Sequence, residues 1–307
     1  MPIDPDVKAF LDTLNAAGLY PATGDPRDLR TRYSAVPVAA MEGIWRIEDI
    51  DIPNGDGRLR LRVYSADDND HAPAILAFHG GGWVLGDLLW MEGQCRQLAI
   101  KSGCRVISVE YRLAPESKFP AAAEDAYTAL EYIVRHATQL GIDTERIGAY
   151  GQSAGGNLVA ALALMTRDRG GPPLRLQVPV YPVIDADFGR PSYHEWGDGP
   201  GLTRAQMQWY WDNYVEPAQR SNPYVSPLHA TTLAGVAPAL VITAEADPLQ
   251  SEGEAYAKRL RDDGVVATHT MYAGMHHGFM NLTQLFPKAQ QAFDEVVVAF
   301  RTCFGID

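Results

Sequence analysis

Residues 151–155 read Gly-Gln-Ser-Ala-Gly and place Ser153 between two glycines. Residues 146–150 before them are partly apolar and predict a strand, and residues 156–165 after them are rich in strong helix formers. A G-x-S-x-G sequence between a strand and a helix is typical of a nucleophile elbow, a sharp turn that lifts the serine hydroxyl above a sheet. The glycines are needed because that turn leaves no room for neighbouring Cβ atoms. The stretch therefore predicts that Ser153 is a nucleophile.

Residues 79–83 read His-Gly-Gly-Gly-Trp and directly follow the apolar run of residues 74–78. Three consecutive glycines cost backbone entropy, but they let backbone N–H groups approach a ligand atom closely. An acyl-transfer enzyme needs such donors to bind the oxyanion of its tetrahedral intermediate. We expect the N–H groups of Gly81, Gly82 and Ala154, the residue after the nucleophile, to form this oxyanion hole. A flexible turn is the alternative, whereas a phosphate-binding loop is excluded because neither G-x-x-x-x-G-K-[ST] nor G-x-G-x-x-G occurs.

His276 and His277 follow the strand predicted at residues 268–272 by a short loop, late in the chain. This is where an α/β-hydrolase places the histidine that acts as its general base. The residues alone leave the choice between these two histidines open.

A carboxylate must orient the base and stabilise its charged form. Asp247 follows the strand predicted at residues 239–243 by a short loop, so it is a candidate for this role. Asp185 and Asp187 are rivals because they also follow a predicted strand. Glu245 is a further rival because it lies two residues from Asp247. The residues alone do not decide among these four carboxylates.

Short apolar runs alternate with helical stretches through most of the chain. The predicted strands are residues 74–78, 105–110, 146–150, 176–181, 239–243 and 268–272. The predicted helices are residues 120–136, 154–168, 252–263 and 288–304, the third with a capping box from Ser251 to Glu254. This alternation predicts an α/β fold in which a largely parallel sheet is covered by helices on both faces.

The N-terminal part of the chain has a different pattern. Residues 4–5, Asp-Pro, predict the N-cap and first residue of a helix. Residues 18–40 contain several prolines and are expected to be irregular. Residues 44–52 and 59–64 alternate apolar and polar side chains around the turn at residues 54–57, which predicts an antiparallel hairpin.

The alternation of strands and helices is interrupted between Tyr181 and Ala239, where no strand is predicted. A loop is expected at residues 185–200, and a helix begins at Thr203, which forms a capping box with Gln206. The helix is apolar on more than one side, through Met207, Trp209, Tyr210, Trp211 and Tyr214. Such an insertion forms either a lid over a pocket or an ordinary part of the core, and both interpretations remain open.

Composition limits the classes of partner. A formal charge of −12 argues against nucleic acid and against stable association with anionic membranes. No apolar run approaches the roughly 20 residues that a membrane-spanning helix needs, and the N-terminus lacks the features of a signal peptide. The three cysteines show no metal-type spacing and are expected to be free thiols in a reducing cytoplasm.

The sequence resembles the hormone-sensitive-lipase-like esterases, bacterial family IV of the α/β-hydrolase superfamily. The resemblance rests on motifs at residues 79–83, 111–116, 153–157, 247–253 and 277–279, which together span about residues 79 to 280. It implies a single α/β-hydrolase domain over residues 1–307, with a mostly parallel eight-stranded sheet flanked by helices. It also implies a helical cap formed by about residues 1–42 and about residues 186–225.

The resemblance also implies residue roles. It selects Asp247 as the acid and His277 rather than His276 as the base, beside the nucleophile Ser153. One departure is Gln152, where many members carry Asp or Thr. The implied activity is a serine carboxylesterase acting on short- to medium-chain esters, with no metal and no other cofactor. An amidase, a lactonase and a non-catalytic receptor for small ligands are the alternatives, because the same fold serves each.

The expected substrate is a small-molecule ester bound in an apolar pocket. The residues predicted to line it are His79, Trp83, Val84, Leu85, Met207, Trp211 and Phe279. The resemblance further implies a possible homodimer through the segment at residues 268–272 and the helix near Lys288.

Overall fold

The computed structural model describes residues 3–16, 23–33, 44–199 and 201–306. Its centre is an eight-stranded sheet with the strand order β1-β2-β4-β3-β5-β6-β7-β8. β2 is antiparallel to β1 and β4, and all other neighbours are parallel, which confirms the predicted sheet. The strands are β1 (Arg46–Asn54), β2 (Gly57–Ser65), β3 (Ala72–Phe78), β4 (Arg105–Val109), β5 (Ile142–Gln152), β6 (Leu176–Val180), β7 (Ala239–Ala246) and β8 (Ala267–His276).

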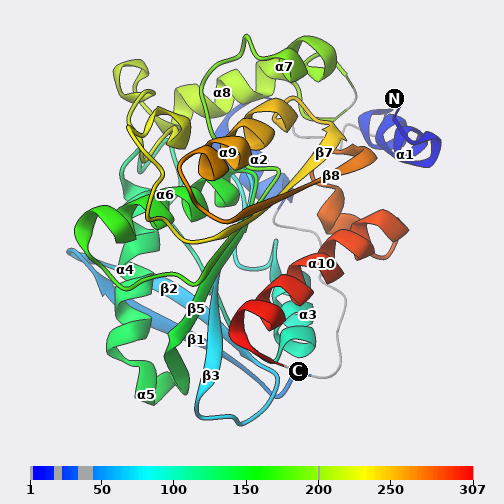
Figure 1. The fold of residues 1–307 in the computed structure, drawn as a ribbon. Coiled ribbons are helices and arrows are strands. Elements are labelled where there is room, and N and C mark those ends of the chain that lie inside the picture. Colours follow the sequence, from blue (N-terminus) through cyan, green and yellow to red (C-terminus); the bar gives the residue numbers. More distant parts are fainter. Residues whose placement is uncertain (1–2, 17–22, 34–43, 200, 307) are drawn as a thin grey trace.

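Helices cover both faces of the sheet (Figure 1), with α4, α6 and α9 on one face and α3 and α10 on the other. The α-helices are α1 (Pro5–Ala16), α2 (Pro26–Tyr33), α3 (Glu92–Ser102), α4 (Ala121–Arg135), α5 (Ala137–Leu140), α6 (Ala154–Arg169), α7 (Pro191–Trp196), α8 (Arg204–Tyr214), α9 (Gln250–Asp262) and α10 (Pro287–Phe304). Short 3-10 helices are η1 (Pro217–Gln219), η2 (Pro227–His229) and η3 (Phe279–Leu282). Among the described residues, no helix has the length and apolar character needed to cross a bilayer.

The central strands are apolar on both sides because each side packs against helices. In β3, Leu76 and Phe78 belong to the core cluster under α4 and α6, whereas Ile75 and Ala77 belong to the cluster under α3 and α10. Successive side chains of a strand point to opposite faces, so a strand covered on both faces must be apolar throughout. All seven residues of β3 are accordingly buried.

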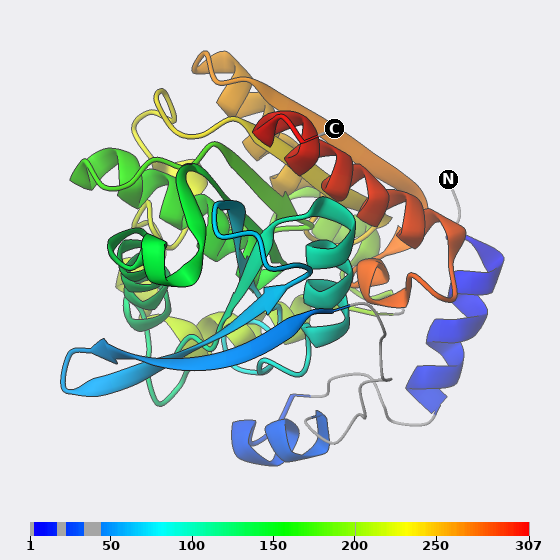
Figure 2. The same cartoon turned by 90° about the horizontal axis from the view of Figure 1, so that it is seen from below.

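The pairing of the parallel strands sets where their following loops meet. Phe78 at the end of β3 pairs with Gly151 near the end of β5. Ala246 at the end of β7 pairs with His276 at the end of β8. Because parallel strands end at the same edge of a sheet, the residues that follow these four strands lie together. α1, α7 and α8 lie at this edge, and Figure 2 shows α1 and α2 standing apart from the helices that flank the sheet.

Two predictions of irregular structure are wrong. Residues 26–33 form α2, although residues 18–40 are predicted to be irregular, and the rest of that range is largely outside the described residues. Pro26 occupies the first helical position, where its missing N–H costs nothing, and Asp25 Oδ1 accepts a hydrogen bond from Arg27 N at 2.8 Å. α7 likewise begins at Pro191, inside the loop predicted at residues 185–200.

The two predicted capping boxes have opposite outcomes. Thr203 and Gln206 form the predicted reciprocal pair at the start of α8. Ser251 does not cap α9, because that helix begins at Gln250, two residues before its predicted start, and its N-cap position is occupied by Leu249. The Ser251 hydroxyl instead lies 2.6 Å from the Ser192 hydroxyl of α7 and links the two helices.

The division of the chain into a hydrolase domain and a cap stays a prediction, and parts of residues 1–42 lie outside the described residues. The homodimer also stays a prediction. Cys95, Cys104 and Cys303 are free thiols, as predicted.

Gly155 in the first turn of α6 has no room for a side chain. A Cβ atom there would lie 2.1 Å from the Phe78 carbonyl oxygen and 2.6 Å from that of His79, so α6 would have to move away from β3. We predict that Gly155→Ala lowers the free energy of unfolding by about 3 kcal/mol or more. Urea titration measures this change.

The control is Gly57→Ala, whose Cβ atom would make an ordinary 3.7 Å contact with the Asn54 carbonyl oxygen. Its free energy of unfolding should stay within about 1 kcal/mol of wild type. Equal stability of the two variants would contradict the close packing of α6 on β3.

Candidate active site

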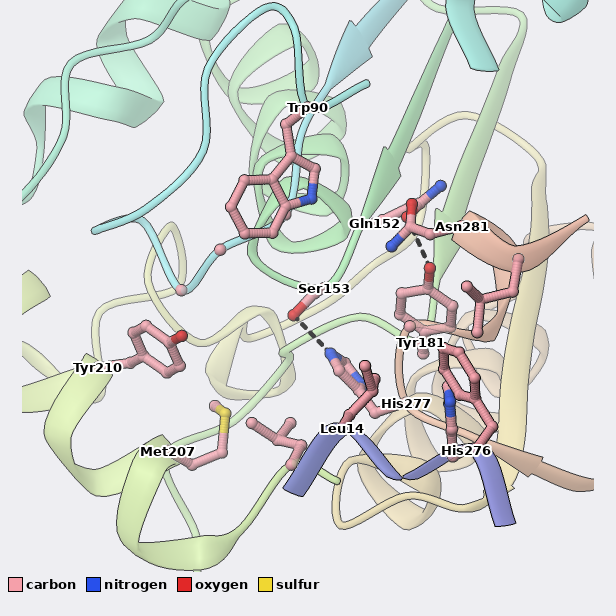
Figure 3. A pocket seen from close by; sticks show the side chains of 17 residues that line it. Leu14, Trp90, Gln152, Ser153, Tyr181, Met207, Tyr210, His276, His277 and Asn281 are labelled. Carbon is pink, nitrogen blue, oxygen red and sulfur yellow. Dashed lines mark hydrogen bonds between the residues drawn. The ribbon is translucent and has the colours of Figure 1, made fainter. Parts of the chain in front are cut away.

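Ser153, His277 and Asp247 form a hydrogen-bonded chain at the carboxyl edge of the sheet. His277 Nε2 lies 3.0 Å from Ser153 Oγ, and His277 Nδ1 lies 2.7 Å from Asp247 Oδ2. Figure 3 shows the contact between Ser153 and His277 at the wall of a cavity. Asp247 is fully buried, while 12% of the His277 side chain is exposed. The structure thus brings together the three residues predicted to act as nucleophile, base and acid.

The hydrogen bonds determine the tautomer of His277. An ionised carboxylate only accepts hydrogen bonds, so Nδ1 must carry the proton that it donates to Asp247. Nε2 then has a free lone pair that accepts a hydrogen bond from the Ser153 hydroxyl group. The other Asp247 oxygen, Oδ1, accepts a hydrogen bond from Leu249 N at 2.8 Å, which holds the carboxylate in place. This arrangement places the unprotonated Nε2 beside the Ser153 hydroxyl group.

Ser153 lies in a strained turn. Its φ of +54° is in a region that residues with a side chain rarely adopt, and it falls between the end of β5 and the start of α6. The backbone is held by a 2.9 Å hydrogen bond from Ser153 N to the Val180 carbonyl oxygen in β6. The predicted nucleophile elbow is therefore present, with the hydroxyl at the N-terminus of a helix.

The glycine loop after β3 is anchored by a buried histidine. The His79 ring stacks on Tyr111 with 4.2 Å between ring centroids, and its Nδ1 lies 2.7 Å from the Gly80 carbonyl oxygen. Burial lowers the pKa of His79 to about 4, so the ring is neutral near neutral pH. The His79 side chain therefore packs between Tyr111 and the glycine loop and holds the loop in place.

Gly81 and Gly82, which are predicted to belong to an oxyanion hole, line the cavity together with Gly80. Gly82 has a φ of +60°, and a Cβ atom there would overlap the Tyr210 ring at 2.1 Å. A larger residue at this position would therefore clash with α8. Ala154, the third predicted donor, is buried at the first position of α6 beside Ser153. The structure places all three residues around the nucleophile, while their role as donors stays a prediction.

The rival residues have other partners. Asp185 pairs with Arg190 and accepts a hydrogen bond from His229 Nε2 at 3.0 Å. Asp187 accepts a hydrogen bond from Gly189 N, and Glu245 accepts one from Gly274 N. None of these three carboxylates bonds to His277 in the described part of the chain.

The cavity beside Ser153 has a volume of about 270 Å³. Of the residues predicted to line a pocket, only Met207 lies on its wall. The structure instead buries His79 beneath the glycine loop and buries the other five in the core: Trp83, Val84, Leu85, Trp211 and Phe279. These apolar side chains stabilise the fold more when they are buried in the core than they would if they faced a water-accessible cavity.

The apolar wall of the cavity is formed largely by residues that were not predicted to line it. Phe10 and Leu14 come from α1, Trp90 from the segment before α3, and Leu282 from η3. Tyr210 of α8 also lines the cavity (Figure 3). On its other side, α8 packs against the core, where Tyr214 stacks on Trp83 at 4.0 Å. The helix therefore serves both as a wall of the cavity and as part of the core, which were the two open interpretations.

Gln152, the departure from the family pattern, joins a hydrogen-bond network next to the nucleophile. Its Oε1 accepts a hydrogen bond from Tyr181 Oη at 2.6 Å, and its Nε2 donates to Tyr150 Oη at 2.7 Å and to Gln94. The Tyr181 ring in turn lies 4.8 Å from the His277 ring. Gln152 therefore connects the wall of the cavity to the side chain of the proposed base.

Metal ligands are not gathered at this site. Within the described ranges, His, Cys, Asp and Glu side chains form no group of three that could hold a metal ion. The absence of a metal or other cofactor stays a prediction.

Comparisons with known proteins identify the family and the fold of this chain. Residues 75–281 match the family described as alpha/beta hydrolase fold. An ethyl acetate hydrolase of Pseudomonas putida is 36% identical, over 98% of this chain and 99% of the relative. The carboxylic ester hydrolase LipN of Mycobacterium tuberculosis is 38% identical, over 97% of this chain and 82% of the relative.

The solved structure of a hyperthermophilic esterase from Pyrobaculum calidifontis matches the same architecture. It is 39% identical, covers 98% of this chain and 99% of its own, and superposes with a TM-score of 0.91. An esterase from Pseudomonas putida superposes with a TM-score of 0.92 at 34% identity, over 99% of this chain and 98% of its own. The chain therefore belongs to the hormone-sensitive-lipase-like carboxylesterases of the α/β-hydrolase superfamily.

Proposed function

We propose that this carboxylesterase hydrolyses short- to medium-chain acyl esters through an acyl-enzyme formed on Ser153. The observation that carries the proposal is the position of His277, within hydrogen-bond reach of both Ser153 and Asp247. A serine hydroxyl is a weak nucleophile until a neighbouring base removes its proton. Nε2 of His277 is that base in the proposed mechanism.

In the first half of the reaction, Ser153 Oγ attacks the ester carbonyl carbon while His277 Nε2 takes the hydroxyl proton. Asp247 stabilises the resulting imidazolium through Nδ1. The C–O bond to the alcohol then breaks, the alcohol leaves with the proton from Nε2, and the acyl group stays on Ser153. A water molecule repeats the sequence, releasing the acid and returning the proton to Ser153.

The carbonyl oxygen becomes an oxyanion in both halves of the reaction. In the proposal, the N–H groups of Gly81, Gly82 and Ala154 bind this oxyanion. One such donor is typically worth about 2.7–4 kcal/mol of activation free energy. The strained backbone at Ser153 and the glycine loop are held before substrate arrives, so little reorganisation is needed during the reaction.

The size of the cavity favours small esters. Its volume of about 270 Å³ falls just below the range of about 300–1,000 Å³ that is usual for drug-sized ligands. The walls are mainly apolar, which suits an unbranched acyl chain. A relative whose name is ethyl acetate hydrolase supports the same class of substrate.

The role of Ser153 can be tested by removing its hydroxyl. Ser153→Ala should lower kcat for p-nitrophenyl butyrate by about 10⁴–10⁶-fold, because no covalent intermediate can form. Ser221→Ala, which changes an exposed serine, is the matched control and should retain wild-type kcat. A nearly wild-type rate in Ser153→Ala would remove the proposed nucleophile.

The acyl-enzyme can be tested by partitioning between water and methanol. Phenyl butyrate and p-nitrophenyl butyrate should give the same ratio of methyl butyrate to butyric acid, since both pass through one butyryl-enzyme. Chromatography of the products measures the ratio. A ratio that depends on the leaving group would show direct attack by water instead.

The chain-length preference can be tested with p-nitrophenyl esters from acetate to palmitate. We predict that kcat/KM is highest for acyl chains of about two to eight carbons, because longer chains exceed the apolar cavity. A maximum at the longest chains would contradict this reading of the cavity.

A further inference from the structure

His276 is a buried histidine in the wall of the same cavity as Ser153. It is the last residue of β8, its side chain points away from the Ser153–His277 contact, and only 3% of its surface is exposed. Neither ring nitrogen has a hydrogen-bond partner among the described residues. Burial, together with the neighbouring His277, lowers the pKa of His276 to about 3, so the ring is neutral near neutral pH.

Packing alone does not account for an imidazole at this position. The Phe10 ring of α1 lies 6.5 Å from the His276 ring between centroids and is tilted by 32°. A phenyl ring would fill the same space without burying two polar nitrogens. Buried polar groups in folded proteins nearly always have a partner, because an unpaired one loses its hydration without compensation. No described residue supplies the partner that an imidazole at this position needs.

The cavity restricts the kind of partner. Its lining contains no Lys, Arg, Asp or Glu side chain among the described residues, so a charged group would be buried without a counter-ion. Gln152 and Tyr181, two polar neighbours in the lining, are bonded to each other. Figure 3 places His276 on the far side of the His277 ring from Ser153, next to α1. His276 is therefore an unpaired polar group in the lining, at a distance from the nucleophile.

We propose that His276 donates a hydrogen bond to a neutral oxygen on the acyl or alcohol chain of the substrate. It is then a specificity-determining residue that favours esters carrying an ether, carbonyl or hydroxyl oxygen away from the scissile bond. This inference rests on the proposed function, because it needs the ester carbonyl to lie at Ser153. A purely alkyl ester leaves the His276 nitrogens unpaired and is the poorer substrate.

The test uses pairs of esters that differ by exchange of one CH₂ group for oxygen. Ethyl 3-methoxypropanoate is compared with ethyl pentanoate for the acyl side, and 2-methoxyethyl butanoate with butyl butanoate for the alcohol side. Wild type should give the higher kcat/KM for the ether in at least one pair. A higher kcat/KM of the wild-type enzyme for the alkyl ester in both pairs would by itself overturn the inference.

His276→Phe removes both nitrogens and keeps a ring. In the pair where wild type prefers the ether, the ratio of kcat/KM for the ether to kcat/KM for the alkyl ester should be about tenfold lower in the variant. The reason is that the site can no longer donate a hydrogen bond. Its kcat/KM for the alkyl ester should fall less than its kcat/KM for the ether. An equal loss for both members of the pair would indicate a structural role and would contradict the proposal.

Three further variants separate recognition from packing. His276→Asn and His276→Gln carry an N–H donor near the positions of Nδ1 and Nε2, and at least one should retain the ether preference. His269→Phe changes another β8 histidine, which bonds to Thr243 and does not line the cavity, and should leave the preference unchanged. Loss of the preference in both amide variants, or in His269→Phe, would argue against His276 as the donor.

The same assays distinguish this inference from the proposed function. If wild type hydrolyses butyl butanoate and Ser153→Ala does not, the proposed function holds whatever the ether preference shows. If wild type hydrolyses neither member of either pair, the proposed function itself fails.

Discussion

The hydrogen bond between the buried Asp247 carboxylate and His277 is the interaction on which the rest of the site depends. A carboxylate that is fully removed from water must be paired, and here it is paired with an imidazole and with a backbone N–H at Leu249. That pairing determines which nitrogen of His277 carries the proton. The other nitrogen then faces Ser153, and the chemistry that we propose follows from this orientation.

Strand pairing in the sheet positions the residues of the site, and the strained backbone lies in the loops that follow the strands. Parallel pairing of β7 with β8 brings Asp247 and His277 side by side, and pairing of β3 with β5 brings the glycine loop to Ser153. The backbone at Trp83 and Ser153 adopts positive φ values that are unfavourable for residues with a side chain. They persist because the surrounding elements are tightly packed, as the absence of room for a Cβ atom at Gly155 shows.

Motifs that are continuous in the chain could be predicted from the sequence, because local backbone requirements reveal them. The elbow around Ser153 and the glycine loop are of this kind. The choice between His276 and His277 needed the family resemblance, since a shift of one residue turns a strand side chain to the other face. Apart from Met207, the apolar side chains that line the cavity could not be predicted, because Phe10 and Leu14 reach it only through the placement of α1.

The central claim is that Ser153 is the activated nucleophile, and covalent labelling tests it most directly. The enzyme is treated with diethyl p-nitrophenyl phosphate, digested, and its peptides are examined by mass spectrometry. We expect one diethylphosphoryl group on Ser153 together with full loss of esterase activity, and little labelling when the His277→Ala variant is treated. Full inactivation with Ser153 unmodified, or with the phosphoryl group on another residue, would contradict it.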